Sequence, residues 1–274
     1  CNANNDGIDI DACERVSISD CNIISGDDSI VLKSTSGKPC RDVTVTNCVL
    51  SSWCNALKLG TESVGSFANI AISNCSIHDT NISGLALEMV DGGTLENISV
   101  SGLVMRNVKN AIFMRLGNRA RPPYRGAPQP AMGAFRNVTV SGVQADGGDK
   151  VGCPIVGLPG HPLEDVTLRD IRVKVAGGGV KADVEREVPE KADSYPEYRI
   201  FGVLPASGFY CRHARGLRLH DVQVSLASPD ERPALVCDDV DRLTVSAFDA
   251  PEGTPDPVLR NCRRSLFYGN RSGS

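Results

Sequence analysis

Short apolar–polar–apolar triplets recur along the chain at a nearly constant spacing. Six of them begin at Val16, Val43, Ile70, Ile98, Val138 and Val166. Their starts are 27, 27, 28, 40 and 28 residues apart. Each triplet alternates as a half-buried strand does, and none has the spacing of an amphipathic helix. A fixed period in this range indicates stacked supersecondary units.

A second triplet follows the first in each of four repeats. These triplets begin at Ile30, Leu57, Leu85 and Ile112. If their outer members face inward, their middle members form an outward column of Val31, Lys58, Ala86 and Phe113, and a second column two places on holds Lys33, Gly60, Glu88 and Arg115. The pattern predicts an all-β fold, a right-handed parallel β-helix, in one domain over residues 1–274. Charge on the two columns makes this sheet a candidate floor for a polar ligand.

Two departures from the period predict long loop insertions, near residues 119–134 and 177–208. The first is rich in Arg and Pro, and the second is rich in charge and Gly. The strand pattern resumes after each one, at Val138 and at Leu217. Both segments are therefore interpreted as loops on one domain rather than as linkers between domains.

The composition excludes several classes of partner. The chain has 274 residues, 41% of them hydrophobic, a net charge of −4 and no basic block. It therefore gives no electrostatic reason to expect nucleic acid or an anionic membrane as a partner. No apolar run approaches the roughly 20 residues that span a bilayer. Because patterned sequence begins at Cys1 without an initiator Met or signal peptide, we expect an N-terminally truncated chain.

Five of the eleven cysteines follow the same period as the strands. Cys21, Cys48 and Cys75 are 27 residues apart, and so are Cys13 and Cys40. Equivalent positions of successive coils stack about 4.8 Å apart. We therefore expect ladders of small buried thiols rather than disulfides, and no CxxC pair supports a zinc site.

Two acidic clusters near the start of the chain carry the candidate chemistry. They are Asn5-Asp6-Gly7-Ile8-Asp9 and Gly26-Asp27-Asp28-Ser29-Ile30. Alignment of Ile8 with Ile30 places Asp6 below Asp28, with Asn55 next above and Asp27 at its side. When carboxylates lie about 5 Å apart, the pKa of one of them rises unless a cation intervenes. Acid/base hydrolysis needs one carboxyl group that keeps its proton beside others that are ionised. A solvated acidic ladder or a structural calcium site is the alternative.

The two clusters resemble the Asn-Thr-Asp and Gly-Asp-Asp motifs of the polygalacturonase-like glycoside hydrolases, family 28. The resemblance implies a right-handed parallel β-helix of the pectin-lyase-like kind and an inverting hydrolase of acidic plant cell-wall polysaccharides. It matches Asp27 to the general acid, and Asp6 and Asp28 to the pair that holds and deprotonates the attacking water. It leads us to expect a monomer without cofactor or metal, located outside the cell or in the periplasm because its substrate is a polymer.

Two family motifs are altered in this chain. The Gly-His-Gly motif falls at Cys54-Asn55-Ala56, and the Arg-Ile-Lys motif falls at Ala86-Leu87-Glu88. In typical members the missing groups assist the acid and bind the substrate carboxylate. The candidates for substrate binding here are Lys33, Asn55, Lys58, Glu88, Arg115 and His213. For Arg115, an ion pair with Glu88 one coil below is an equal alternative.

Two other functions stay open at this point. One is a polysaccharide lyase or epimerase on the same fold, which needs a base at the sugar C5 and a cation to stabilise the enolate-like intermediate. Lys58 and Arg115 are candidates for that cation. The other is a carbohydrate-binding β-helix without catalytic activity.

Overall fold

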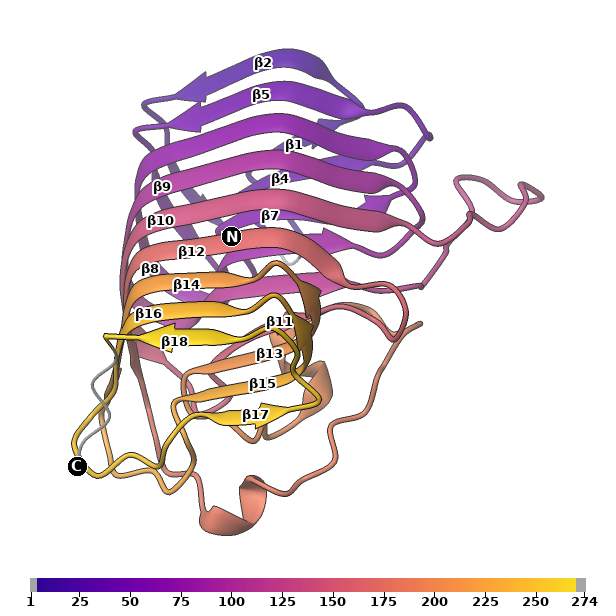
Figure 1. The fold of residues 1–274 in the computed structure, drawn as a ribbon. Coiled ribbons are helices and arrows are strands. Elements are labelled where there is room, and N and C mark those ends of the chain that lie inside the picture. Colours follow the sequence, from indigo (N-terminus) through magenta and orange to yellow (C-terminus); the bar gives the residue numbers. More distant parts are fainter. Residues whose placement is uncertain (1–3, 270–274) are drawn as a thin grey trace.

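A computed structural model describes residues 4–269, and these form a parallel β-helix (Figure 1). Successive coils stack from β2 at one end to β18 at the other. The described part is nearly all strand, with two short 3₁₀ helices, η1 (Lys181–Asp183) and η2 (Tyr198–Phe201). The β-helix predicted from the period is confirmed. Within residues 4–269 no helix is long and apolar enough to cross a membrane.

One sheet carries the candidate site. Its strands, in stacking order, are β1 (Ile8–Asp11), β4 (Ile30–Ser34), β7 (Leu57–Ser63), the ends of β8 (Ser66–Met89) and β9 (Thr94–Leu116), β11 (Cys153–Val156), β13 (Phe209–Arg215), β15 (Leu235–Asp241) and β17 (Val258–Arg260). All neighbours pair in parallel. We call it the site sheet.

Two further sheets complete each coil. The second consists of β2 (Glu14–Ser19), β5 (Cys40–Thr46), the starts of β8 and β9, β10 (Ala134–Gly148), β12 (Leu163–Val175), β14 (Arg218–Leu226), β16 (Thr244–Asp249) and β18 (Leu266–Tyr268). The third consists of β3 (Asn22–Ser25), β6 (Val49–Ser52), the middle of β8 and of β9, and the later parts of β10, β12, β14 and β16. β8 and β9 each run through more than one sheet because their strand pattern continues around the bends.

The register of the site sheet is the one that the hydrophobic alternation predicts. Ile8 pairs with Ile30, Ile30 with Leu57, and Leu57 with Leu85. A shift by one residue would turn every apolar side chain to the opposite face. The register therefore places Lys58 between Val31 and Ala86 on the outer face of the sheet.

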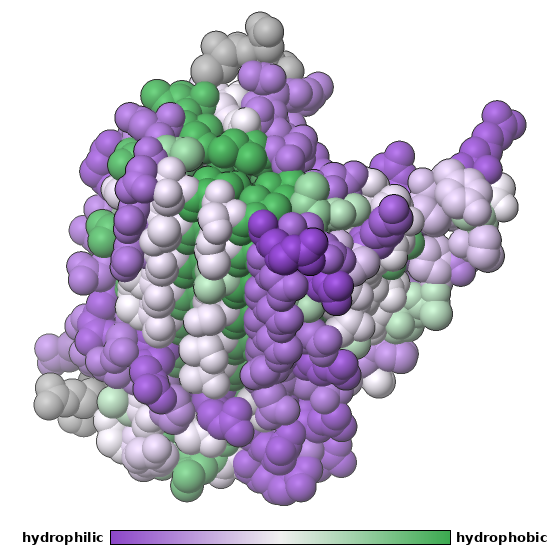
Figure 2. Space-filling model, turned by 90° about the horizontal axis from the view of Figure 1, so that it is seen from above, coloured by the Kyte–Doolittle hydropathy of each residue, from purple (hydrophilic) through white to green (hydrophobic). Residues whose placement is uncertain are grey.

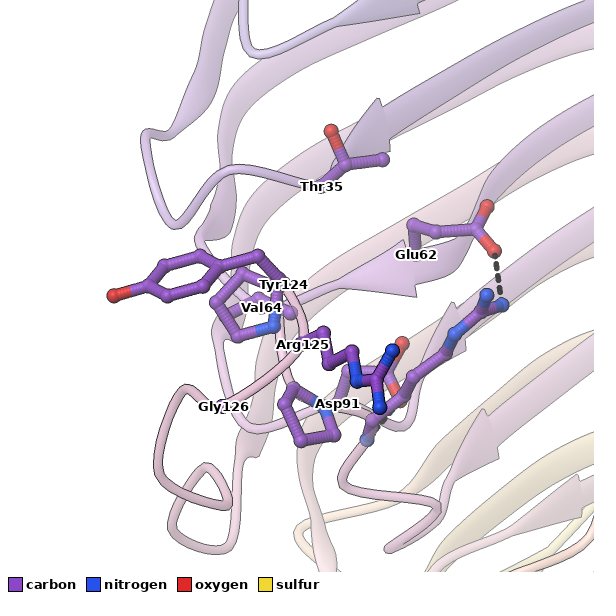
Figure 3. Close-up of a pocket in the computed structure, with 10 residues that line it drawn as sticks. Thr35, Glu62, Val64, Asp91, Tyr124, Arg125 and Gly126 are labelled. Atoms are coloured by element: carbon purple, nitrogen blue, oxygen red, sulfur yellow. Dashed lines mark hydrogen bonds and ion pairs between the residues drawn. The ribbon is translucent and has the colours of Figure 1, made fainter.

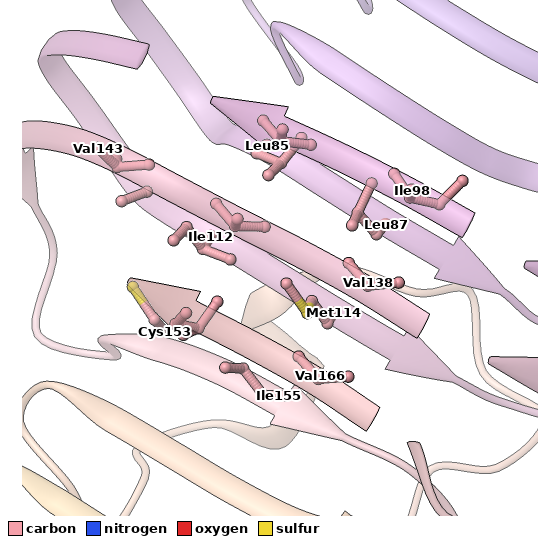
Figure 4. Close-up of a cluster of buried hydrophobic side chains, with 14 of the residues drawn as sticks. Leu85, Leu87, Ile98, Ile112, Met114, Val138, Val143, Cys153, Ile155 and Val166 are labelled. Atoms are coloured by element: carbon pink, nitrogen blue, oxygen red, sulfur yellow. The ribbon is translucent and has the colours of Figure 1, made fainter. Parts of the chain in front are cut away.

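The core lies inside the coil, where apolar side chains from the site sheet meet those of the sheet opposite. Figure 4 shows Leu85, Ile112 and Ile155 of the site sheet beside Ile98 and Val138 of the second sheet. All five are at most 2% exposed. In the first coil, by contrast, Ile8, Val16 and Ile23 are only partly buried, and apolar side chains are visible at this end of the molecule (Figure 2).

Asparagine and aspartate form ladders at the bends of the coil. Asp42, Asn69, Asn97 and Asn137 occupy equivalent bends, all with φ between 53° and 57°. Asn and Asp adopt this left-handed conformation more readily than other residues with a side chain. Each Asn donates its amide to the side-chain oxygen one coil below, at 2.7–3.1 Å. These bonds hold successive coils in register.

The ten cysteines within residues 4–269 are all free thiols, as the period predicts. Cys40, Cys48 and Cys75 are buried. Burial raises the pKa of Cys40 and Cys75 to about 11, which keeps these thiols protonated and unreactive.

The second insertion folds back over the site sheet. Tyr198, Phe201 and Leu204 pack on Ala86 and Phe113, and all five side chains are at most 4% exposed. The column of Val31, Lys58, Ala86 and Phe113 faces outward as predicted, but it is buried. The expectation that this column is an open floor for a ligand is therefore wrong for its upper part, because apolar residues of the insertion cover it.

Candidate active site

Three carboxylates meet where the chain turns into β1 and β4. Asp6 precedes β1, and Asp27 and Asp28 precede β4, so the register of the two strands stacks Asp6 against Asp28. One oxygen of each carboxylate lies within 4.8 Å of the others. The Asp28 N–H also donates to Asp6 Oδ1 at 2.9 Å. The structure thus brings the three predicted carboxylates together, while their catalytic roles stay a prediction.

Lys33 neutralises the lowest carboxylate of the cluster. Its Nζ lies 2.8 Å from Asp6 Oδ2 and 2.7 Å from Asp9 Oδ1. Burial raises the pKa of Asp6, but the hydrogen bond and charge of Lys33 outweigh this effect and leave it below its ordinary value. Asp9 has a raised pKa because of burial, and Asp6 beside it adds to the effect. Asp6 is therefore held ionised.

Asp28 is 3% exposed, and each of its carboxylate oxygens has a donor. Its Oδ1 accepts from the Asn55 N–H at 3.0 Å and from Asn55 Nδ2 at 2.8 Å. Lys58 Nζ lies 3.0 Å from Oδ2. Asn55, which stands where the family has histidine, therefore binds the carboxylate itself, and its Oδ1 accepts from the Ser83 N–H at 3.1 Å.

Lys58 is buried between two carboxylates. It is 5% exposed, and its Nζ lies 4.0 Å from Glu88 Oε2 in addition to its contact with Asp28. Burial lowers the pKa of Lys58, but the two negative charges outweigh it and raise the pKa well above its ordinary value. Burial raises the pKa of Glu88 to about 8, although Lys58 opposes the shift. Thr61 Oγ1 donates to Glu88 Oε2 at 3.2 Å.

Glu88→Gln is expected to flatten the pH dependence of stability. The folded pKa of Glu88, about 8, lies above its ordinary value of 4.5, so between these values the folded protein binds a proton that the unfolded chain has released. This contribution is complete below pH 4.5 and is lost as the pH rises toward 8, by at most about 1.4 kcal/mol per pH unit. Denaturant unfolding at pH 4.5, 6 and 8 measures it. Exposed Glu187→Gln is the control; equal slopes for wild type and Glu88→Gln would contradict the prediction.

Asp27 differs from its two neighbours in its partners. Within residues 4–269 no Lys, Arg or His forms an ion pair with its carboxylate. Its backbone is fixed, because its carbonyl accepts the hydroxyls of Ser25 and Ser52 and its N–H donates to the Asn5 carbonyl at 3.2 Å. The Cys54 thiol lies beside the carboxylate; burial first, and then Asp27, raise the pKa of Cys54 to about 12. The cluster thus contains two carboxylates paired with lysine and one that is not.

The cluster fits acid/base chemistry better than a cation site. Carboxylate oxygens are ligands that calcium and magnesium accept, and Asp6, Asp27 and Asp28 could each offer one. However, the ammonium groups of Lys33 and Lys58 already neutralise two of the three carboxylates. A divalent cation there would be repelled by both.

Tyr195 of the second insertion covers one side of the site. Lys58 Nζ lies 3.3 Å from the Tyr195 hydroxyl and 5.6 Å from its ring centroid. The Arg119 guanidinium lies 5.8 Å from the same centroid and forms two hydrogen bonds with the buried Asp91. Tyr195 itself is 52% exposed. The sequence does not predict this contact, because nothing in it links Tyr195 to Lys58, which is 137 residues away.

A pocket of about 400 Å³ lies beyond Arg119, under the first insertion (Figure 3). Its walls come from the exits of β4, β7 and β8 and from the insertion, and the lining residues are Thr35, Glu62, Val64, Asp91, Arg121, Pro122, Pro123, Tyr124, Arg125 and Gly126. Arg121 Nη1 lies 3.6 Å from Glu62 Oε1. The Arg- and Pro-rich loop therefore presents guanidinium groups at the exit end of the site sheet.

Arg115 lies away from the carboxylates. It pairs with Glu88 in register, as predicted, but its guanidinium donates to the carbonyls of Gly157, Glu190 and Lys191 at 2.6–3.1 Å. It is 1% exposed, and burial lowers its pKa to about 10. Its described contacts hold the second insertion, and a role in substrate binding stays a prediction.

His213 lies on β13, also beneath the second insertion. It is 6% exposed, with Nδ1 2.7 Å from Asp239 Oδ2 and Nε2 3.1 Å from Glu190 Oε1. Both ring nitrogens are thus occupied within the chain. The structure therefore joins Lys33, Asn55, Lys58 and Glu88 to the three carboxylates, but not Arg115 or His213.

The fold and the site together define a parallel β-helix with a cluster of carboxylates on its outer face. Residues 2–192 match the glycosyl hydrolases family 28, and the chain belongs to this family. A "Probable polygalacturonase" of Vitis vinifera is 23% identical over 192 residues, which cover 65% of this chain and 38% of that protein. The chain thus spans about two fifths of the length of this curated relative.

Proposed function

We propose that this chain is a glycoside hydrolase that cleaves a pectic or related acidic cell-wall polysaccharide. The observation that carries the proposal is the unequal pairing of the three carboxylates. Lys33 forms an ion pair with Asp6 and Lys58 forms one with Asp28, whereas Asp27 has no cationic partner within residues 4–269. A carboxyl group that can hold a proton beside carboxylates that cannot is what acid/base cleavage of a glycosidic bond requires.

In this proposal Asp27 protonates the departing glycosidic oxygen. Asp6 and Asp28 hold a water between them and accept its proton as it attacks the anomeric carbon. Carboxyl groups of inverting enzymes are usually about 6.5–9.5 Å apart. The nearest oxygens here lie within 4.8 Å. The inverting course therefore rests on family membership rather than on this distance.

An acidic polysaccharide is supported by the cations around the cluster. Arg121 and Arg125 line the pocket under the first insertion, and Lys33 is 22% exposed beside Asp6. Arginine suits bidentate recognition of a carboxylate. These groups supply the positive charge that Ala86 and Glu88 lack. Action on a polymer further supports a location outside the cell or in the periplasm, and we propose a monomer.

The lyase or epimerase alternative is disfavoured because both of its candidate cations already have partners within the chain. Lys58 is held between Asp28 and Glu88, and Arg115 is bound to three backbone carbonyls. Neither is free to stabilise an enolate-like intermediate. Asp27, which lies beside two carboxylates that are paired with lysine, favours catalysis over binding alone.

Product analysis on defined pectic oligosaccharides tests the proposal. We expect new reducing ends without ultraviolet absorbance, and proton NMR during the first turnovers should show inversion at the anomeric carbon. Ultraviolet-absorbing unsaturated products would establish a lyase instead. Binding of the oligosaccharides with no turnover on any of them would establish the binding module.

A further inference from the structure

A second pocket, of about 250 Å³, lies where β6 turns into β7. It is lined by Ser52, Trp53, Asp79, Thr80, Asn81, Asn107 and Lys109. Trp53 is the only tryptophan of the chain, and it is 68% exposed. Tryptophan is highly buried on average, whereas the exposed indole of Trp53 stands on the wall of a pocket.

Trp53 is held in a fixed position relative to Asp27. The backbone N–H of Trp53 donates to the Ser25 carbonyl at 3.3 Å, and the backbone N–H of Cys54 donates to Ser52 Oγ at 2.8 Å. The same Ser52 hydroxyl donates to the carbonyl of Asp27. The turn that presents the indole is thus tied to the turn that presents the carboxylate.

The pocket extends from Asp27 along the axis of the coil. The register that pairs Ile30 with Leu57 places Cys54 above Asp27, and the Ile82 N–H bond to the Cys54 carbonyl at 2.8 Å places Asn81 next. The pairing of β8 with β9 puts Lys109 above Asn81. With coils about 4.8 Å apart, Lys109 lies about 14 Å from Asp27 on the same side of the molecule.

Of the charged groups that line this pocket, the one without a partner is a cation. Asp79 is already bound by Arg106 at 3.0 Å, by His78 at 3.0 Å and by Asn107 Nδ2 at 2.8 Å. The Lys109 ammonium, in contrast, has no hydrogen-bond or ion-pair partner among residues 4–269, and neither has the side-chain amide of Asn81. A ligand with an apolar ring face and a carboxylate would complement both ends of the pocket.

We propose that Trp53, Asn81 and Lys109 form a subsite for a uronic acid unit of the substrate. The indole face packs on the C–H face of the sugar ring, the Asn81 amide bonds its hydroxyls, and the Lys109 ammonium binds its carboxylate. The role of this subsite in substrate cleavage rests on the proposed function, in which Asp27 protonates the departing oxygen. Binding of a uronic acid at the subsite does not depend on hydrolysis, so the subsite and the proposed function can fail separately.

The single tryptophan allows binding to be measured directly. Asp27→Asn protein is titrated with a defined oligogalacturonate and with its fully methyl-esterified counterpart, and binding is followed by intrinsic fluorescence and by calorimetry. We expect a saturable change in tryptophan emission with the calorimetric Kd. In the same background, Lys109→Gln should weaken the acidic ligand about tenfold and leave the ester unchanged. Trp53→Ala, followed by calorimetry, should weaken both ligands.

Exposed Lys174→Gln, added to Asp27→Asn, is the matched control and should bind as the Asp27→Asn parent does. Calorimetric binding without a tryptophan signal, or with equal affinity in Lys109→Gln, overturns the subsite even if the protein hydrolyses pectic substrates. Absence of any binding overturns it too. A Lys109-dependent signal in a protein without hydrolytic activity supports the subsite and overturns the proposed function.

Discussion

Asp27→Asn is expected to lower kcat by about 10²–10⁴-fold, the usual contribution of general acid–base catalysis. The amide cannot supply the proton that the departing oxygen needs, but it has nearly the shape of the carboxyl group. Asp27 is fixed mainly through its backbone, by Ser25, Ser52 and Asn5, so the substitution should leave the fold intact. Initial rates of reducing-end release, with calorimetric Kd and Tm of the same variant, measure the effect.

Exposed Asp20→Asn, at the bend before β3, is the matched control because it removes an equal charge away from the cluster. It should retain wild-type kcat, Kd and Tm. Substrates with a highly acidic leaving group depend less on protonation, and Asp27→Asn should retain more activity on them. Wild-type turnover in Asp27→Asn on natural oligosaccharides would exclude Asp27 as the acid.

The stacked part of the site could be predicted because a β-helix converts sequence spacing into spatial contact. An offset of 22 residues places Asp6 on Asp28, and an offset of 27 places Asn55 on the other side of Asp28. Inward and outward faces follow from the alternation of apolar residues, which also fixes the register. The bend ladder of Asp42, Asn69 and Asn97 has the same spacing and could have been found in the same way.

The contacts made by the insertions could not be predicted. Tyr195 lies in a segment without strand period, so no offset relates it to Lys58 or Arg119. For the same reason, an ion pair with Glu88 and binding of a ligand are equally consistent with the position of Arg115 in the sequence, although its side chain turns to the backbone of the second insertion. The contacts of a loop depend on where it folds back on the sheet. Because the loop has no repeat, its sequence does not indicate which residues of the sheet it will contact.

Lys58→Met is expected to impair both stability and activity, because it leaves two buried carboxylates without their cation. Asp28 and Glu88 are 3% and 1% exposed, and breaking a buried ion pair from one side costs about 3–5 kcal/mol. Lys58 opposes the raised pKa of Glu88 in wild type, so in the variant the loss of stability with rising pH should continue further above pH 8 than it does in wild type. Denaturant unfolding at several pH values measures this.

The activity of Lys58→Met should fail in a characteristic way. In the proposed mechanism Asp28 takes a proton from the water, and the substitution removes the ammonium 3.0 Å from it, so the acidic limb of the kcat/KM profile should move to higher pH. Adding Glu88→Gln removes one of the two buried carboxyl groups that lose their cation and should restore part of the stability, a coupling that a double-mutant cycle quantifies. Lys174→Met should change neither profile. An acidic limb that stays in place in Lys58→Met would show that the Lys58–Asp28 ion pair does not support proton acceptance from the water, and the proposed division of roles among the three carboxylates would lose its basis.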